Sequence, residues 1–298
     1  MNGIIPLYKE KGMTSGDCVY KLRKILHERH IGHTGTLDPD VDGVLVICVG
    51  QATKLVNSLM NSHKIYRGEA TFGYSTTTED SSGDVLKKQA ITEPISDDRL
   101  DNAMNILTGD IVQTPPMYSA VRVNGKRLYE YAREGIEVER PSRKINVYHF
   151  NRLGPSIYDE DKQLQKVRFE VECSKGTYIR TLAVQLGELL SVPSHMSQLT
   201  RTYGSFFGID QTVTLDYIQQ HMNENNTDFL MPIASVFSDL AGHELTDDEW
   251  QLVQNGNDLS LESDKLEIAL FYHGVMKAIY LKVGDVYRPK LMLLKNDR

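Results

Sequence analysis

The sequence predicts an α+β protein with a mixed central sheet flanked by helices, followed by a small C-terminal β-rich domain. Its 298 residues suggest about two domains at roughly 150 residues each. Alternating apolar and polar residues at 65–73 and 165–173 are typical of strands, whereas 96–107 and 174–190 have helical spacing. The last 60 residues contain short alternating segments, which predict the β-rich domain.

The composition is that of an ordinary globular protein. Apolar residues make up 40% and charged residues 24%, which excludes a disordered or fibrous chain. The longest apolar run, 44–49, is far shorter than the roughly 18 residues that span a membrane. The N-terminus lacks the apolar stretch of a signal peptide, so we expect a cytoplasmic protein without a membrane partner. Three cysteines without CxxC spacing indicate reduced thiols and argue against a zinc site.

The first half of the chain offers several clear secondary-structure signals. Thr14 begins a capping box, and apolar residues at helical spacing then predict a helix that runs to about His30. The continuous apolar run 44–50 indicates a buried strand, and 52–60 a short helix after it. A polar loop is expected at 76–84.

The second half contains two helices and a segment that resembles an arm. Ser96 is expected to cap the helix 96–107, and the helix within 174–190 should bury four apolar residues, namely Ile179, Leu182, Ala183 and Leu186. Segment 113–135 combines a Pro-Pro turn, a short strand, an Asn-Gly turn and a small basic helix. The polar stretch within 223–242 is a plausible domain boundary.

The net charge of −7 at first disfavours a polyanionic partner. However, residues 1–210 carry 26 basic and 26 acidic side chains, and residues 211–298 carry 7 and 14, so the acidic excess lies in the C-terminal part. Segment 122–144 is locally basic, with 7 basic against 4 acidic side chains. This distribution is compatible with a specific polyanion that contacts one face of the protein.

The densest polar cluster is loop 33–43, which permits three interpretations. Asp38, Asp40 and Asp42, followed by a glycine, match the first half of an EF-hand calcium loop, but the required glutamate is replaced by Val49. The loop could also be a solvated turn that uses Asp and Gly for its backbone conformation. A third interpretation is a carboxylate held beside a buried strand to act as nucleophile or base. Spacing alone does not choose among the three aspartates.

The motif GHTGTLDPxxxG in this loop resembles the catalytic loop of the TruB family of pseudouridine synthases. Other family signatures follow in the same order over roughly residues 3–210. They are KGMTS (11–15), Lys64-x-Tyr66 with Phe72-Gly73, Asp80-x-x-Gly83, QTPPMYSAVRVNGKRLYEYAREG (113–135), SKGTYIRTLA (174–183) and Leu199-Thr200-Arg201. The sequence departs from the pattern at Lys9-Glu10, where the family has Lys-Pro, and at 40–42, where two further carboxylates replace small residues.

The resemblance implies three catalytic residues. Asp38 would be the nucleophile, and Arg180 the fixed cation that keeps it ionised, because a guanidinium offers a permanently charged planar fork. Tyr66 would be the aromatic platform on which the extruded base stacks. Taken in isolation, Arg180 is more often a surface arginine and Tyr66 a tyrosine of a half-buried strand.

The resemblance also implies residues that contact RNA. His33 would enter the space that the flipped base vacates, Tyr178 and Leu199 would pack near the base, and Asp80 would order the surroundings of the active site. Basic side chains are candidates for phosphate contacts, and these are Lys64, Lys126, Arg127 and Arg201.

The implied activity is isomerisation of uridine 55 in the tRNA T loop by a monomer that needs no metal or other cofactor. The catalytic domain would span 1–235, with an RNA-clasping arm at about 113–144, and a PUA-like domain would span 240–298. Two alternatives are a noncatalytic T-arm-binding RNA-folding factor and a guide-RNA-dependent pseudouridine synthase. The complete catalytic set argues against the first, and the arm against the second.

Overall fold

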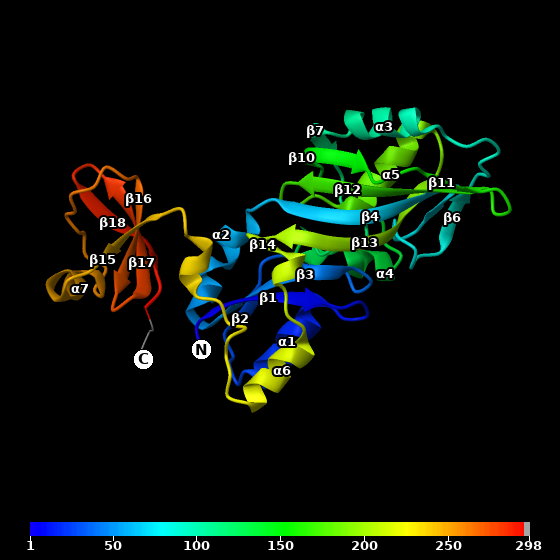
Figure 1. Cartoon of the computed structure of the whole chain (residues 1–298). Helices are drawn as coiled ribbons and strands as arrows, with labels where there is room; N and C mark the ends of the chain where they lie inside the picture. The colour runs from blue at the N-terminus through cyan, green and yellow to red at the C-terminus, as the bar shows by residue number, and fades with distance from the viewer. Residues whose placement is uncertain (295–298) are drawn as a thin grey trace.

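The computed structural model describes residues 1–294, and a mixed ten-stranded sheet forms its centre (Figure 1). Strand β13 runs parallel to β3 and antiparallel to β4, which confirms the predicted mixed sheet. Seven strands follow one another across the sheet, in the order β1 (Gly3–Lys9), β3 (Asp42–Val49), β13 (Ser194–Gly204), β4 (Lys64–Phe72), β12 (Leu164–Cys173), β10 (Arg143–Arg152) and β7 (Gly109–Gln113). Three short strands extend this sheet. Strand β2 (Ile31–His33) pairs with β3, β11 (Ile157–Asp159) with β12, and β14 (Phe207–Gly208) with β13.

Helix α1 (Ser15–Ile25) begins as predicted and ends early. The Thr14 hydroxyl accepts the Asp17 N–H at 3.0 Å, and the Asp17 carboxylate accepts the Thr14 N–H at 2.9 Å. The helix was predicted to reach about His30, which is wrong. His27 adopts a left-handed φ of 49°, and the chain turns so that β2 can pair with β3. Strand pairing therefore overrides the local helical pattern.

Helices α3 (Asp97–Ile106) and α5 (Ile179–Leu190) cover one face of the sheet and close the main core. Ser96 caps α3 as expected, since its hydroxyl accepts the Arg99 N–H at 3.4 Å. The four apolar residues predicted to face inward from α5 are all buried. Two further helices of this part are α2 (Val56–Met60) and α6 (Leu215–Asn223). Helix α2 follows a 3₁₀ turn at Gly50–Leu55.

Two hairpins project from the sheet. The first joins β5 (Tyr74–Thr76) to β6 (Val85–Lys88) through the predicted loop, and the second joins β8 (Arg122–Val123) to β9 (Lys126–Arg127). Asn124 and Gly125 form the tight turn of the second hairpin with φ values of 50° and 83°. Helix α4 (Leu128–Arg133) follows directly. Leu128 is the one buried residue of 120–142, so this arm has little core of its own.

The C-terminal part forms a separate four-stranded sheet, which confirms the predicted β-rich domain. Its strands lie in the order β15 (Ala241–Glu244), β16 (Glu267–Tyr272), β17 (Val275–Val283) and β18 (Val286–Met292), and α7 (Asp247–Val253) covers it. Its own small core includes Tyr280 and Tyr287. The last four residues of the predicted 240–298 domain lie outside the described residues. No helix within residues 1–294 has the length and apolar character needed to cross a membrane.

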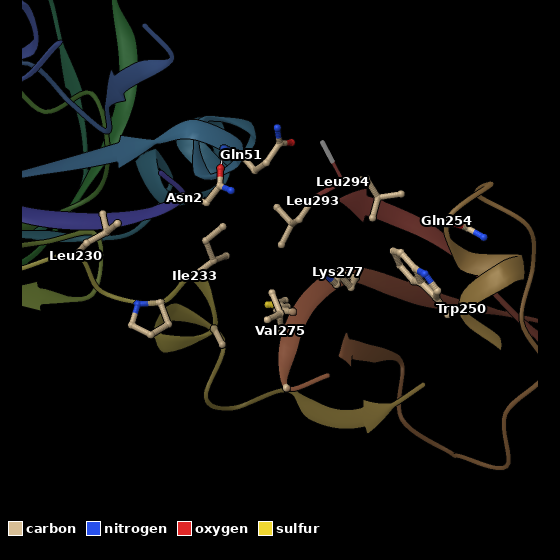
Figure 2. Close-up of a pocket in the computed structure, with 14 residues that line it drawn as sticks. Asn2, Gln51, Leu230, Ile233, Trp250, Gln254, Val275, Lys277, Leu293 and Leu294 are labelled. Atoms are coloured by element: carbon tan, nitrogen blue, oxygen red, sulfur yellow. Dashed lines mark hydrogen bonds between the residues drawn. The ribbon is translucent and has the colours of Figure 1, made fainter. Parts of the chain in front are cut away.

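A pocket of about 870 Å³ lies between the C-terminal sheet and the segment around Ile233 (Figure 2). Trp250 stacks on Tyr272 with ring centres 4.8 Å apart, and the Lys277 ammonium lies 5.5 Å from the Trp250 ring centre. Beside this pocket, apolar residues of β17 pack in one cluster with residues of β1 and β3. The pocket is lined by none of the residues that the sequence predicts for the active site.

Candidate active site

The loop that carries Asp38 is fixed from both sides by backbone contacts. The Ser15 hydroxyl accepts the Leu37 N–H at 2.9 Å and donates to the Leu37 carbonyl at 3.3 Å. The Lys9 ammonium, whose side chain is fully buried, donates to the Pro39 carbonyl at 3.2 Å. Asp38 lies between these two anchors, so its backbone has little freedom.

The three aspartates of the loop face different surroundings. Asp38 Oδ2 lies 3.0 Å from Arg180 Nε. Asp42 belongs to β3, where its carboxylate accepts the Thr200 hydroxyl at 2.5 Å and the Tyr8 hydroxyl at 3.1 Å. Asp40 is exposed. The geometry therefore singles out Asp38, which spacing alone could not do. Nowhere in residues 1–294 do three or more metal-binding side chains gather for a cation, as the calcium interpretation would require.

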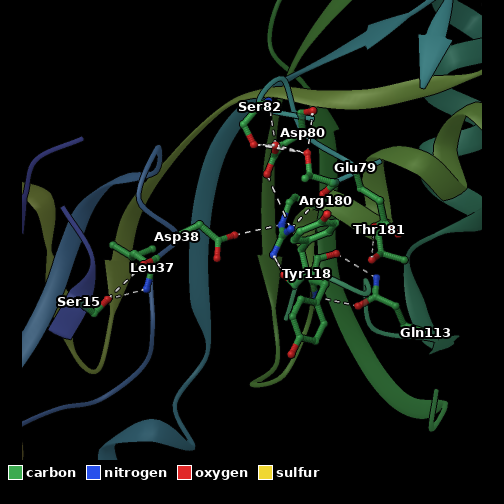
Figure 3. Close-up of polar contacts among 12 residues, drawn as sticks. Ser15, Leu37, Asp38, Glu79, Asp80, Ser82, Gln113, Tyr118, Arg180 and Thr181 are labelled. Carbon is green, nitrogen blue, oxygen red and sulfur yellow. Dashed lines mark hydrogen bonds and ion pairs between the residues drawn. The ribbon is translucent and has the colours of Figure 1, made fainter. Parts of the chain in front are cut away.

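Arg180, at the start of α5, joins three segments that are distant in sequence (Figure 3). Its side chain is only 6% exposed. Besides the Asp38 contact, Nη1 donates to the Thr78 carbonyl at 3.0 Å and Nη2 to the Tyr118 carbonyl at 2.9 Å. The interpretation of Arg180 as an ordinary surface arginine is therefore wrong. Its guanidinium holds the Asp38 loop, the 77–84 loop and the start of the arm together.

Asp80 shapes the loop next to this pair. One carboxylate oxygen accepts the Thr78 hydroxyl at 2.6 Å, the Ser82 N–H at 3.0 Å and the Ser82 hydroxyl at 2.6 Å. The other oxygen lies 3.7 Å from Arg180 Nη1. Arg180 thus lies between two carboxylates. The Asp80 carboxylate is hydrogen-bonded within its own loop, whereas the Asp38 side chain is 42% exposed to solvent.

The surroundings of Asp38 shift the pKa of its carboxyl in opposite directions. Burial raises the pKa of the Asp38 carboxyl above its usual value, and the nearby Asp80 carboxylate adds to the increase. Arg180 acts in the opposite direction and favours the ionised form. A partly desolvated carboxylate beside a fixed cation has the character of an activated nucleophile.

Tyr66 and Leu199 lie on the neighbouring strands β4 and β13 and are 8% and 7% exposed. Leu199 pairs with Gly68, and a Cβ at Gly68 would lie 2.9 Å from the Leu199 side chain. The glycine at position 68 therefore leaves the space that the Leu199 side chain occupies. Burial raises the pKa of the Tyr66 hydroxyl, so it stays protonated at neutral pH.

Tyr178 is held in place by Gln113, the first residue of the 113–135 motif, to which no role was assigned from the sequence. Gln113, which is buried, accepts the Tyr178 N–H at 2.7 Å and donates to the Tyr178 carbonyl at 3.1 Å. The Arg143 guanidinium lies 5.6 Å from the Tyr178 ring centre. Gln113 lies at one end of the predicted arm segment and Arg143 near the other, so Tyr178 contacts both sides of the base of the arm.

His33 is half-buried in β2, where its Nδ1 accepts the Gly35 N–H at 3.3 Å. Burial lowers the pKa of His33, and the positive charge of Arg201 lowers it further, so the ring is neutral at pH 7. A neutral ring fits insertion into a stacked loop without the cost of burying a charge.

Two predicted phosphate contacts, Lys64 and Arg201, are buried. The Lys64 ammonium donates to the Met60 and Ser62 carbonyls, both at 2.6 Å, and burial lowers its pKa to about 8. Arg201 Nε donates to the Val44 carbonyl at 2.6 Å. These contacts give both side chains a structural role and do not favour a phosphate contact.

A Cβ at Gly43 would lie 2.2 Å from the Arg201 carbonyl, so the pairing of β3 with β13 requires glycine at this position.

The other two residues predicted to contact phosphates, Lys126 and Arg127, lie on the arm. Lys126 forms an ion pair with Glu134, and Arg127 donates to the Tyr129 hydroxyl at 3.0 Å. Arg127 is exposed, as the predicted contact requires.

Similarity to known proteins identifies the family of this chain. Residues 23–179 match the family described as TruB family pseudouridylate synthase (N terminal domain). The tRNA pseudouridine synthase B of Streptococcus sanguinis is 50% identical over 99% of this chain and 100% of the relative. That of Lacticaseibacillus paracasei is 48% identical over 100% of this chain and 99% of the relative. The chain belongs to the TruB family of pseudouridylate synthases.

Solved structures show that this TruB-family chain shares its fold with more distant proteins. The structure of a Cbf5-Nop10-Gar1 complex matches 99% of this chain and 86% of that chain, with a TM-score of 0.69 and 24% identity. An H/ACA RNP bound to a substrate RNA containing 2′-deoxyuridine matches with a TM-score of 0.68 and 22% identity over 99% and 86%. The predicted pseudouridine synthase fold is thereby confirmed.

Proposed function

We propose that the protein isomerises uridine 55 in the T loop of tRNA to pseudouridine. The observation that carries the proposal is the pair formed by Asp38 and the buried Arg180 at 3.0 Å. Relatives about 50% identical over the whole chain are named tRNA pseudouridine synthase B, which supports tRNA as the substrate. Since one chain holds every residue named for the reaction, we also propose that the enzyme acts as a monomer, in the cytoplasm where tRNA is found.

In the proposed reaction, the C1′–N1 bond of the uridine breaks, the base turns over and a C1′–C5 bond forms. The proton on C5 is lost, N1 gains a proton, and the covalent bond to Asp38 breaks again, so the product is an isomer of the substrate. The Asp38 carboxylate attacks the target nucleotide, at C1′ of the sugar or at C6 of the base, and forms a covalent intermediate. Arg180 keeps Asp38 ionised and oriented through three contacts. The reaction exchanges a C1′–N1 and a C5–H bond for a C1′–C5 and an N1–H bond, so it changes no net oxidation state.

Access to the uridine requires that the base leave the folded T loop. The base would stack on Tyr66, with Leu199 and Tyr178 around it, while His33 enters the vacated space. The basic arm at about 113–144 would close over the T loop and contact its phosphates. The alternatives assign this chain a noncatalytic RNA-folding role or a guide RNA, and the arm supports a stand-alone enzyme instead.

Incubation with an unmodified tRNA transcript, followed by mapping of pseudouridine by position, tests the proposal. Pseudouridine at position 55 alone is expected, without any guide RNA. Modification at another position would contradict the proposed substrate site. Tight binding without modification would favour the RNA-folding alternative.

Tyr66→Phe is expected to bind tRNA and react nearly normally, because the aromatic face that stacks on the base is retained. Tyr66→Ala should lose both affinity and rate, since stacking on an aromatic ring is typically worth about 1–3 kcal/mol per base. Single-turnover rates and tRNA affinities of both variants provide the measurement. An inactive Phe variant that still binds would assign a chemical role to the hydroxyl, and full activity of both would remove Tyr66 from the site.

The arm is expected to be cut by proteases in the free enzyme and protected by tRNA. Leu128 is its one buried residue within 120–142, so its local stability is low. Contacts from its basic side chains to phosphates would order it only on RNA. Limited proteolysis with and without tRNA is the measurement. An unchanged cleavage pattern would show that the arm is a fixed structural element.

The double variant Lys126→Ala with Arg127→Ala should weaken tRNA binding and reduce its salt dependence. Each lost phosphate contact lowers the log–log slope by roughly 0.7–0.9. The single-turnover rate at saturating enzyme should stay at the wild-type value, because neither residue contacts the reacting atoms. A salt titration of affinity provides the measurement, and an unchanged slope would mean that both charges are merely solvated.

A further inference from the structure

Glu79 is a half-buried carboxylate next to the active site that the proposed reaction does not use. It lies in the 77–84 loop with a left-handed φ of 63°, and its carbonyl accepts the Met196 N–H at 3.0 Å. Its carboxylate accepts the Thr181 hydroxyl at 2.7 Å. Because Thr181 follows Arg180 in the first turn of α5, Glu79 ties this turn to the loop (Figure 3).

The charges around Glu79 come from helix α5 and from the arm. Arg180 and Arg140 favour its ionised form, Glu188 of α5 opposes it, and burial raises the pKa of the Glu79 carboxyl overall. Arg140 also donates to the Pro115 carbonyl at 2.9 Å, across the base of the arm. Glu79 therefore contacts the start of α5, and the charge of Arg140 at the base of the arm acts on its carboxyl.

The start of α5 lacks a negative charge of its own. This helix has 12 residues, its N-cap Tyr178 provides no side-chain cap, and its first turn contains no acidic residue. Carboxylates near a helix N-terminus are favourable, because the free N–H groups carry partial positive charge. Glu79 provides this charge from a different segment of the chain.

We propose that Glu79 is a positioning residue, which holds the first turn of α5 against the 77–84 loop so that Arg180 meets Asp38 in its productive geometry. The positive charge of Arg140, which donates to the Pro115 carbonyl at the base of the arm, favours the ionised form of the same carboxylate. The inference rests on the proposed function, since the effect is measured on pseudouridine formation. Misplacement of a reacting group by about 1 Å reduces rates by up to about 100-fold, so a positioning residue has a measurable effect.

Glu79→Gln tests the proposal, because glutamine keeps the size and an acceptor for Thr181 but loses the charge. At pH 8 the single-turnover rate on saturating tRNA should fall about tenfold, with tRNA affinity unchanged. The difference should shrink as the pH is lowered through the raised pKa of the wild-type Glu79 carboxyl, because the protonated carboxyl resembles the amide. The acid sensitivity of Asp38 affects both proteins and cancels in the ratio of their rates.

Glu188→Gln is the matched control, since Glu188 is an exposed carboxylate of the same region and should leave the rate unchanged. Arg140→Gln should reduce the rate less than Glu79→Gln, and the double variant should be no slower than Glu79→Gln alone. A Glu79→Gln rate equal to the wild type at every pH would overturn the inference and leave the proposed function intact. A pH-independent loss with a lowered Tm would also overturn it, by reducing Glu79 to a structural role. A wild-type protein that forms no pseudouridine would overturn the proposed function and this inference together.

Discussion

Asp38→Asn is expected to bind tRNA with unchanged affinity and to form pseudouridine at least about 10⁴-fold more slowly than the wild type, as is typical when a covalent nucleophile is lost. The amide has nearly the shape of the carboxylate but no nucleophilic charge. The loop should stay in place, because its anchors bind the backbone of Leu37 and Pro39. Arg180 also keeps its two carbonyl acceptors. Single-turnover rates and binding assays measure the two effects separately.

Asp40→Asn and Asp42→Asn are the matched controls within the same loop and should retain most activity. Asp40 is exposed, and an asparagine at position 42 still offers an oxygen to the Thr200 hydroxyl. The substitution also replaces the oxygen that accepts the Tyr8 hydroxyl by an amide NH2, and neither change touches the Asp38–Arg180 pair. If Asp42→Asn were inactive while Asp38→Asn reacted, the assignment of the nucleophile would be wrong.

Elements with a strong local signal were predictable from the sequence. The apolar run of β3, the alternation in β4 and β12, and the caps of α1 and α3 lie where local patterns indicated. Each of these signals is encoded within about ten neighbouring residues. The Asn124-Gly125 turn is similar, since its residue types determine the backbone conformation of a two-residue hairpin loop.

Strand β13 shows why other elements escaped prediction. Its sequence SHMSQLTRTYG is mostly polar, so it lacks the apolar alternation of a strand. It nevertheless lies in the middle of the sheet, with His195 and Arg201 buried. These side chains are accommodated by carbonyl acceptors of Tyr74 and Val44, which are more than a hundred residues away in sequence. Only the tertiary structure provides such partners.

The same distinction applies to the candidate site, where motif residues were predictable and residues that depend on distant contacts were not. Asp38, Tyr66 and Arg180 could be named because motifs carry them, and the structure places Asp38 and Arg180 in contact. Gln113 and Glu79 were missed, because their roles depend on contacts with Tyr178 and Thr181 from other segments. No spacing rule relates Gln113, at the first position of the arm segment, to the N-cap Tyr178 of α5 65 residues later.

Arg180→Ala is expected to slow pseudouridine formation by about 10²–10³-fold, the range typical for loss of one preorganised charged donor, with only a modest loss of tRNA affinity. Three segments lose their common partner, because the guanidinium contacts Asp38, Thr78 and Tyr118. Arg180→Lys is the matched comparison. It keeps the charge but cannot reproduce the planar set of three contacts, so its rate should lie between those of wild type and alanine.

The pH profiles of these two variants separate charge from geometry. Burial raises the pKa of Asp38 and Arg180 lowers it, so removal of the cation moves this pKa further upward. Activity needs the ionised carboxylate and is lost as the pH falls through this pKa. The acid limb of Arg180→Ala should therefore lie at higher pH than that of the wild type, while Arg180→Lys should stay close to the wild type. Coincident acid limbs for wild type and Arg180→Ala would show that the Arg180–Asp38 pair does not control the ionisation of the nucleophile, and the rate loss would then be purely geometric.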